Sequence, residues 1–165
     1  LSFIERSINL EKISYEETEI KLNEKKQYYL HYPAIYPVSL NDARRTSRYG
    51  DRPDPFTGHN RFHEGDDFSG DIGVPVVATA NGVVKKAKWN GSFGKYIEID
   101  HGYGFVTVYG HLSKLNVKKG DKIIRGQLIG NIGNTGRSTA PHLHYEVQYK
   151  KKHTNPNKYY YNLNL

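Results

Sequence analysis

The sequence has 165 residues, a formal net charge of +7, 16 glycines, seven prolines and 14 tyrosines, and it contains no cysteine. That length suits one compact domain with an additional segment, and the glycine and tyrosine content is typical of a turn-rich β protein. Without cysteine, any metal must be bound by histidines and carboxylates. The positive charge favours polyanionic partners, but the basic residues are scattered, which argues against nucleic acid.

The first 30 residues differ from the rest because they contain neither glycine nor proline. Leu1, Ile4 and Ile8 recur at helical spacing, and Ile13 and Ile20 continue the pattern more loosely, which predicts one amphipathic or partly exposed helix. This helix either lies on the following domain or pairs with a partner protein. Its apolar stripe covers too few heptads to predict a coiled coil.

The organisation expected from these patterns is a helix and connector over residues 1–40, a main domain over 41–157 and a C-terminal tail over 158–165. No run of about 18 apolar residues is present, so neither a signal peptide nor a membrane-spanning helix is predicted. We therefore expect a signal or membrane anchor only in a longer form of the protein.

Short apolar segments separated by glycines begin near residue 60 and predict strands. The dipeptide Asn81-Gly82 is a hairpin signal between two of them. Regular short strands with turn signals predict a mainly β fold, an antiparallel sandwich or barrel. The predicted strands are Val74–Ala80, Gly82–Ala87, Lys95–Asp100, Phe105–Leu112, Ile123–Ile132 and His142–Tyr149.

Three short motifs combine histidine with residues that could share its chemistry. In His63-Glu64-Gly65-Asp66-Asp67, alternation in extended backbone directs His63 and Asp67 to the same side. Gly65 leaves space between them. The spacing therefore predicts an imidazole and a carboxylate that can bind one metal ion.

The other two motifs lie in predicted strands. His142-Leu143-His144 places two imidazoles on one face and Leu143 on the opposite, core-facing side. In Tyr109-Gly110-His111, the same alternation places a phenol and an imidazole on one face.

Three ligands from histidine and aspartate, with a fourth position left for water, form the arrangement of a catalytic zinc site. The two histidines beyond that ligand set could move protons and stabilise a developing oxyanion. Each motif alone is weak evidence, but the three together predict a zinc-dependent hydrolase.

The segments that carry these motifs resemble the lysostaphin/LytM-type zinc peptidases, which cleave peptides in peptidoglycan. The resemblance covers roughly residues 45–157 and includes "FHEGDDFSG", "VYGHLS" and "TGRSTAPHLHYEV". It implies a mainly antiparallel β-sheet fold, a sandwich or half-barrel with an open groove, and one zinc ion per chain.

Carried over by motif position, the resemblance implies that His63, Asp67 and His144 bind zinc. His142 would be the general base that takes a proton from the attacking water, and His111 would hold or protonate the tetrahedral intermediate.

Two features leave alternatives open. The family usually has an apolar residue where this chain has Asp66, which either faces the core or competes as a ligand. Tyr109 is a candidate for the oxyanion tyrosine of some members through its proximity alone.

The remaining four histidines are set aside. We expect His101 to have a structural role in a hairpin and His59 to lie in a plain loop, and we expect neither His31 nor His153 to bind a metal.

The expected function is therefore a zinc-dependent endopeptidase of the bacterial cell envelope, in the periplasm, that cuts peptidoglycan cross-links between D-alanine and a diamino acid. A glycine bridge is the alternative scissile bond. A second alternative is a non-catalytic regulator or assembly subunit of cell-wall hydrolysis, with a protein partner bound through the N-terminal helix.

Overall fold

The computed structural model describes residues 2–161 and separates into two compact units, one ending at Leu30 and one beginning at His31. The first unit is formed by helix α1 (Phe3–His31) up to Leu30, and no residue of this helix is buried. Its start is fixed by a reciprocal cap, in which the Ser2 amide donates to the Glu5 carboxylate (2.7 Å) and the Glu5 amide donates to Ser2 Oγ (3.3 Å). The predicted N-terminal helix is confirmed. No helix within residues 2–161 is long and apolar enough to cross a membrane.

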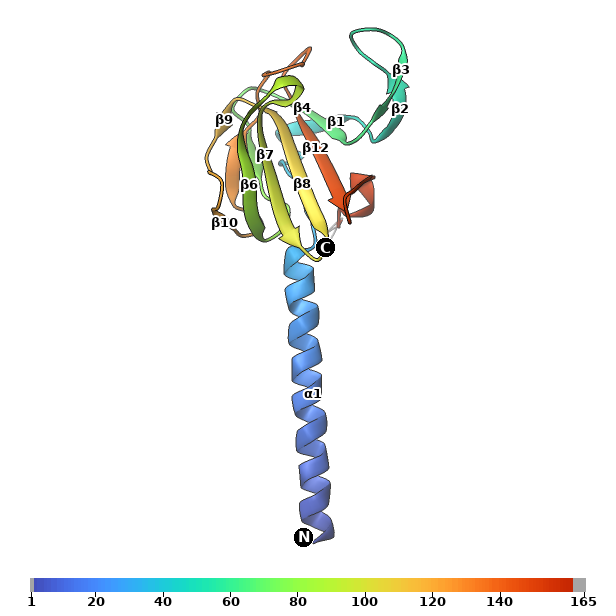
Figure 1. Cartoon of the computed structure of the whole chain (residues 1–165), viewed down its shortest axis with the longest axis vertical. Coiled ribbons are helices and arrows are strands. Elements are labelled where there is room, and N and C mark those ends of the chain that lie inside the picture. Colours follow the sequence, from blue (N-terminus) through green and yellow to red (C-terminus); the bar gives the residue numbers. More distant parts are fainter. Residues whose placement is uncertain (1, 162–165) are drawn as a thin grey trace. The chain divides into compact units, whose positions relative to one another are not determined.

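The second unit is built from antiparallel strands in three sheets (Figure 1). The largest sheet has eight strands in the order β1-β4-β12-β8-β7-β6-β10, with β13 paired to β12; the others are β5-β11-β9 and the β2-β3 hairpin. The strands are β1 (Ala43–Ser47), β2 (Gly50–Pro53), β3 (Asn60–His63), β4 (Asp66–Gly70), β5 (Pro75–Val77), β6 (Gly82–Asn90), β7 (Gly94–Gly102), β8 (Phe105–Leu112), β9 (Lys114–Leu115), β10 (Lys122–Ile123), β11 (Leu128–Asn131), β12 (His142–Tyr149) and β13 (Lys152–Thr154), with 3₁₀ turns η1 (Gly91–Phe93) and η2 (Pro156–Lys158). The mainly antiparallel β fold is confirmed, and the large sheet is open rather than closed.

Strand β12 lies between β4 and β8, and its apolar and polar side chains point to opposite faces of the sheet. Leu143, Tyr145 and Val147 are fully buried, and they alternate with His144 and Glu146 on the other face. A change of register by one residue would exchange these two sets, so the core fixes which side chains face outward.

The predicted hairpin at Asn81-Gly82 is wrong, because the strands on either side of it belong to different sheets. Strand β5 pairs with β11, whereas β6 pairs with β7 and β10. Asn81 instead bonds to distant segments: its carbonyl accepts from His101 Nδ1 (2.7 Å) and its side chain accepts from the Arg125 amide (2.8 Å). The predicted strand Ile123–Ile132 is likewise divided into β10 and β11, at a turn where Gly126 has φ 81°.

The C-terminal segment packs on this unit as far as the structure describes it. Tyr159 is buried, and the Tyr160 ring stacks on Tyr36 with 4.2 Å between centroids. Of the expected tail, residues 162–165 lie outside the described residues.

Candidate metal centre

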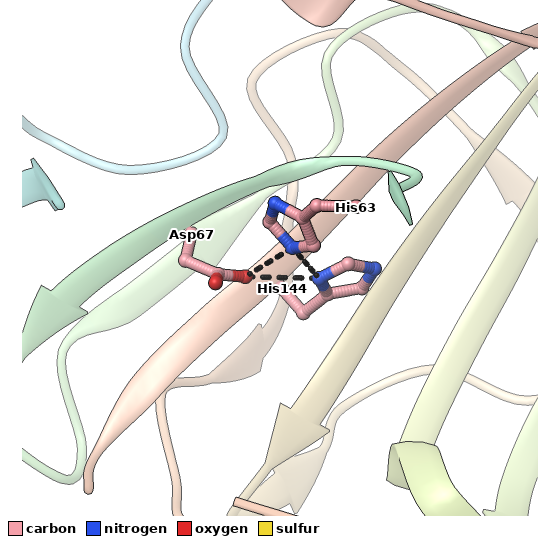
Figure 2. Close-up of side chains that lie close together, drawn as sticks. All are labelled: His63, Asp67 and His144. Atoms are coloured by element: carbon pink, nitrogen blue, oxygen red, sulfur yellow. Dashed lines mark hydrogen bonds and ion pairs between the residues drawn. The ribbon is translucent and has the colours of Figure 1, made fainter. Parts of the chain in front are cut away.

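Three side chains, His63, Asp67 and His144, lie close together (Figure 2) and line a groove with His111 and His142. His63 Nε2 lies 3.2 Å from Asp67 Oδ1 and 3.1 Å from His144 Nδ1, and His144 Nδ1 lies 2.9 Å from the same Asp67 oxygen. All three residues are buried. The structure thus brings together the three residues that the sequence motifs selected as a ligand set.

The donor set fits a zinc ion. Imidazole nitrogens and one carboxylate oxygen are typical zinc ligands, with bonds of about 2.0–2.2 Å, so neighbouring ligand atoms of a tetrahedral ion are roughly 3.3 Å apart. The three observed separations, 2.9, 3.1 and 3.2 Å, fall within a few tenths of an ångström of that spacing. Small outward movements of the rings would accommodate the ion.

The fold brings the ligands together through strand pairing and one tight turn. His144 on β12 and Asp67 on β4 are direct partners in the antiparallel register. His63 ends β3, and the turn at Glu64-Gly65 returns the chain to β4. A Cβ at Gly65 would clash with the Tyr145 carbonyl oxygen and would lie 3.1 Å from His144 Cε1, so only glycine allows this approach.

Hydrogen bonds behind the ligands orient each of them. His63 Nδ1 donates to the Arg48 carbonyl (2.9 Å), and His144 Nε2 donates to Glu146 Oε1 (3.0 Å). The other nitrogen of each imidazole therefore points into the cluster, where a metal ion could replace the hydrogen now shared between the ligands. Arg52 Nη2 lies 3.3 Å from Asp67 Oδ2, which leaves Asp67 Oδ1 turned towards the two imidazoles.

The charges inside the cluster are strongly coupled. Burial alone would raise the pKa of Asp67, but hydrogen bonds and charge from His144 and His63 hold that pKa well below its usual range. Burial alone would lower the pKa of His144, but its hydrogen bonds to Asp67 and Glu146 outweigh burial and raise the pKa to about 9. The cluster therefore favours a cation, which is a proton or a metal ion.

Two more imidazoles lie beside the cluster. His142 Nε2 is 3.8 Å from Asp67 Oδ1, and its Nδ1 donates to the Ala140 carbonyl (2.8 Å). The His111 ring lies 4.6 Å from the His142 ring, between centroids, and its Nδ1 donates to the Thr135 carbonyl (2.8 Å). Burial, reinforced by the nearby His142, lowers the pKa of His111 to about 4. His111 is therefore neutral at pH 7, with Nε2 as a free acceptor.

Tyr109 and His111 do not share a face, contrary to the expectation from strand alternation. His111 has φ 61°, a left-handed conformation that is rare for a non-glycine residue, and this reverses the direction of its side chain at the end of β8. Tyr109 is fully buried, and its hydroxyl bonds to Thr79 and Thr107 in the core, each at 3.1 Å. Among residues 2–161, no tyrosine lines the groove. The suggestion that Tyr109 stabilises an oxyanion there is therefore wrong.

Asp66 faces away from the metal cluster and is fully buried. Its Oδ2 accepts from Arg45 Nη1 (3.2 Å) and from the Tyr160 hydroxyl (3.1 Å), and its Oδ1 accepts from the Tyr49 amide (3.0 Å). These three donors occupy the carboxylate, so Asp66 is part of the core and does not compete with Asp67.

The groove walls are tied together beside the cluster. The loop after β2 carries the buried Asp54, whose carboxylate accepts from Arg137 Nη2 on the opposite wall (3.0 and 3.2 Å). The Arg137 guanidinium also lies 4.5 Å from the centre of the Phe56 ring. Arg137 therefore shapes the groove.

Sequence reasoning missed two residues that contact this cluster, Arg52 and Glu146, and a third, His153, that contacts Glu146. Glu146 could have been found, because it follows His142 and His144 at the same two-residue spacing on one face of β12. His153 Nδ1 lies 3.4 Å from Glu146 Oε2, whereas nothing in the sequence around His153 indicated such a contact. Arg52 lies on β2 and has no sequence signal that links it to Asp67.

More than half of the chain matches a known family. The profile of peptidase family M23 matches residues 61–156, which include all five of the residues selected from the motifs. The chain belongs to peptidase family M23. This confirms the resemblance seen in the motifs, because lysostaphin is among the similar structures.

Named relatives and solved structures of the M23 domain agree with this assignment. ShyA of Vibrio cholerae, named a peptidoglycan DD-endopeptidase, is 46% identical over 113 residues, which are 68% of this chain and 26% of that protein. ShyC of the same organism, with the same description, is 42% identical over 102 residues, 62% of this chain and 24% of that protein. The chain thus spans about a quarter of the length of these relatives.

Two crystal structures resemble the domain closely. A zinc-containing peptidase from Vibrio cholerae is 40% identical with a TM-score of 0.66, over 73% of this chain and 37% of that one. The catalytic domain of lysostaphin from Staphylococcus simulans is 37% identical with a TM-score of 0.66, over 72% of this chain and 92% of that one.

Proposed function

We propose that this M23 domain is a zinc-dependent endopeptidase that cuts peptidoglycan cross-links between D-alanine and a diamino acid in the bacterial cell envelope. The observation that carries the proposal is the orientation of four imidazoles. His63, His111, His142 and His144 each hold one ring nitrogen against a carbonyl or carboxylate, which leaves the other nitrogen directed at one groove. The DD-endopeptidase names of ShyA and ShyC support the choice of bond.

In this proposal His63, Asp67 and His144 hold one zinc ion. When bound, zinc supplies Lewis acidity, which polarises a substrate carbonyl and lowers the pKa of water towards neutrality. The chain's own groups then move the protons. In the neutral tautomer whose Nδ1 donates to the Ala140 carbonyl, His142 Nε2 is an acceptor, and in that form it can take a proton from the attacking water and return it to the leaving amine.

His111 has a complementary part. The resemblance implied that His111 holds or protonates the tetrahedral intermediate, but its Nδ1 hydrogen is donated to the Thr135 carbonyl, so neutral His111 has no hydrogen left to donate. Its Nε2 instead accepts a hydrogen bond from the attacking water and so orients it. Its low pKa also avoids two adjacent positive charges when His142 gains a proton. The left-handed backbone at His111 is what directs this ring into the groove.

The test is digestion of purified peptidoglycan from a Gram-negative source and from a glycine-bridged source, followed by mass spectrometry of the fragments. We expect zinc-loaded protein to convert D-alanyl cross-linked dimers to monomers and expect a chelator to stop the conversion. Cleavage of glycine bridges alone would overturn the choice of bond, and chelator-resistant cleavage would overturn the zinc requirement.

Variants separate the ligands from the proton-transfer residues. We expect His63→Ala, Asp67→Ala and His144→Ala to lose stoichiometric zinc. We expect His142→Ala and His111→Ala to keep zinc while turnover falls by about 10²–10⁴, the range for proton-transfer groups. Full turnover in either of these last two variants would contradict the role assigned to that residue.

A further inference from the structure

A second group of ionisable side chains adjoins the metal cluster, and two of its members, Glu64 and Glu146, line the same groove as the histidines. The group consists of Glu64, Glu146 and His153. Glu146 bonds to the ligand His144 through Oε1 (3.0 Å), and its Oε2 faces His153 Nδ1 at 3.4 Å. His153 Nε2 in turn lies 3.8 Å from Glu64 Oε2.

These contacts link the two chain segments that carry the ligands His63 and His144. Glu64 directly follows His63 at the end of β3, and Glu146 follows His144 by two residues on β12. His153 comes from β13, which pairs with β12, so that Gln148 is its backbone partner. The imidazole of His153 therefore stands between the carboxylates attached to the two ligand-bearing segments.

The unpaired atom in this group belongs to His153. Within the described residues, His153 Nδ1 is buried and lacks a hydrogen-bond partner in its present orientation, which is costly. Glu146 has a side chain that is 3% exposed, and it bonds to His144 through Oε1, while its Oε2 lies 3.4 Å from His153 Nδ1. A small rotation of the His153 ring would give Nδ1 a hydrogen bond to Glu146 Oε2.

We propose that His153 is a positioning residue for the metal site. His153 holds the Glu146 carboxylate in place, and Glu146 in turn keeps His144 oriented so that His144 Nδ1 points at the metal. His153 touches neither the metal position nor the groove, so its effect passes through Glu146. Glu64 completes the link at the surface, where its side chain is 54% exposed. The inference rests on the proposed metal site, but it does not depend on which peptide bond is cut.

The first experiment measures zinc dissociation constants by competition with a chromophoric chelator. It compares the wild type, His153→Ala, Glu146→Ala and the double variant. Changes in such outer partners weaken metal binding by about 10- to 100-fold. We expect His153→Ala to weaken zinc binding by about 10-fold, and we expect it to add nothing in the Glu146→Ala background, because both changes break the same link. His59→Ala, in the exposed loop after β2, is the matched control and should bind zinc like the wild type.

Two further measurements distinguish positioning from a purely structural role. Cobalt(II)-loaded His153→Ala should show an altered visible absorption band, because the band reports ligand geometry. His153→Gln, whose amide can still donate to Glu146, should recover most of the zinc affinity. A lower unfolding midpoint in chelator with an unchanged zinc constant would overturn the inference and leave the proposed function standing. Failure of the wild type to bind stoichiometric zinc would overturn both.

Discussion

Asp66 and Asp67 are adjacent carboxylates on β4 with opposite surroundings, and the structure predicts opposite consequences for replacing them. Asp66→Ala would leave three donors without their acceptor: the Arg45 guanidinium, the Tyr160 hydroxyl and the Tyr49 amide. Removing one partner of a buried ion pair costs about 3–5 kcal/mol. Arg45 is 19% exposed and keeps Asn157 as a partner at 2.6 Å, which places the cost at the lower end, about 3 kcal/mol.

The assay is urea unfolding in chelator at pH 7, so that zinc binding does not contribute to the free energy of unfolding. A loss of about 3 kcal/mol is a large part of the 5–15 kcal/mol that a typical domain has. Asp66→Asn keeps an acceptor for the Tyr49 amide and should lose about 1–2 kcal/mol. Both variants, once folded, should bind one zinc ion as tightly as the wild type, whereas Asp67→Ala should not.

The opposite pattern would refute this reasoning. If Asp66→Ala weakened zinc binding as much as Asp67→Ala and left the free energy of unfolding unchanged, then Asp66 would be the ligand. The surroundings described for both carboxylates would then be wrong.

Three further predictions concern the core and the turn between ligands. Burial lowers the pKa of His101 from 6.5 to about 4, so the unfolded chain takes up a proton before the folded chain does, and stability is lost as the pH falls below 6.5. In paired urea titrations, the free energy of unfolding of the wild type should fall by about 2 kcal/mol more than that of His101→Gln between pH 7 and pH 5. Gly65→Ala would press a methyl group against the Tyr145 carbonyl; we expect a loss of about 1–3 kcal/mol together with weaker zinc binding, and unchanged zinc affinity would count against the described turn. Thr79→Val removes the hydroxyl that bonds Tyr109 and Tyr145, so thermal unfolding should show a loss of about 1–3 kcal/mol, whereas zinc titration should match the wild type.

The sequence was sufficient for the parts of the site that follow strand periodicity. His142-Leu143-His144 lies in β12 with Leu143 in the core, as alternation predicts. The pairing of His63 with Asp67 also followed from spacing, although a turn rather than continuous extended backbone brings them together.

Periodicity failed where a single backbone angle or a long-range contact decides the outcome. The left-handed conformation of His111 separates it from Tyr109, and no neighbouring residue signals that conformation. The Asn81-Gly82 dipeptide is a local hairpin signal, but no hairpin forms there, and Asn81 instead makes hydrogen bonds to the distant residues His101 and Arg125. Arg52 reaches Asp67, and His153 reaches Glu146, through hairpins whose pairing only the folded chain defines.

The alternation along β12 also bears on how the site is assembled during folding. Because the polar and apolar residues of this strand share one register, the side chains of the groove acquire their positions only when the hydrophobic interior has closed around Leu143 and Tyr145. Amide hydrogens of β12 should therefore exchange with solvent only through global unfolding, and activity should return on refolding at the same rate as they become protected. The positions of the metal-binding side chains are in this sense a consequence of core formation.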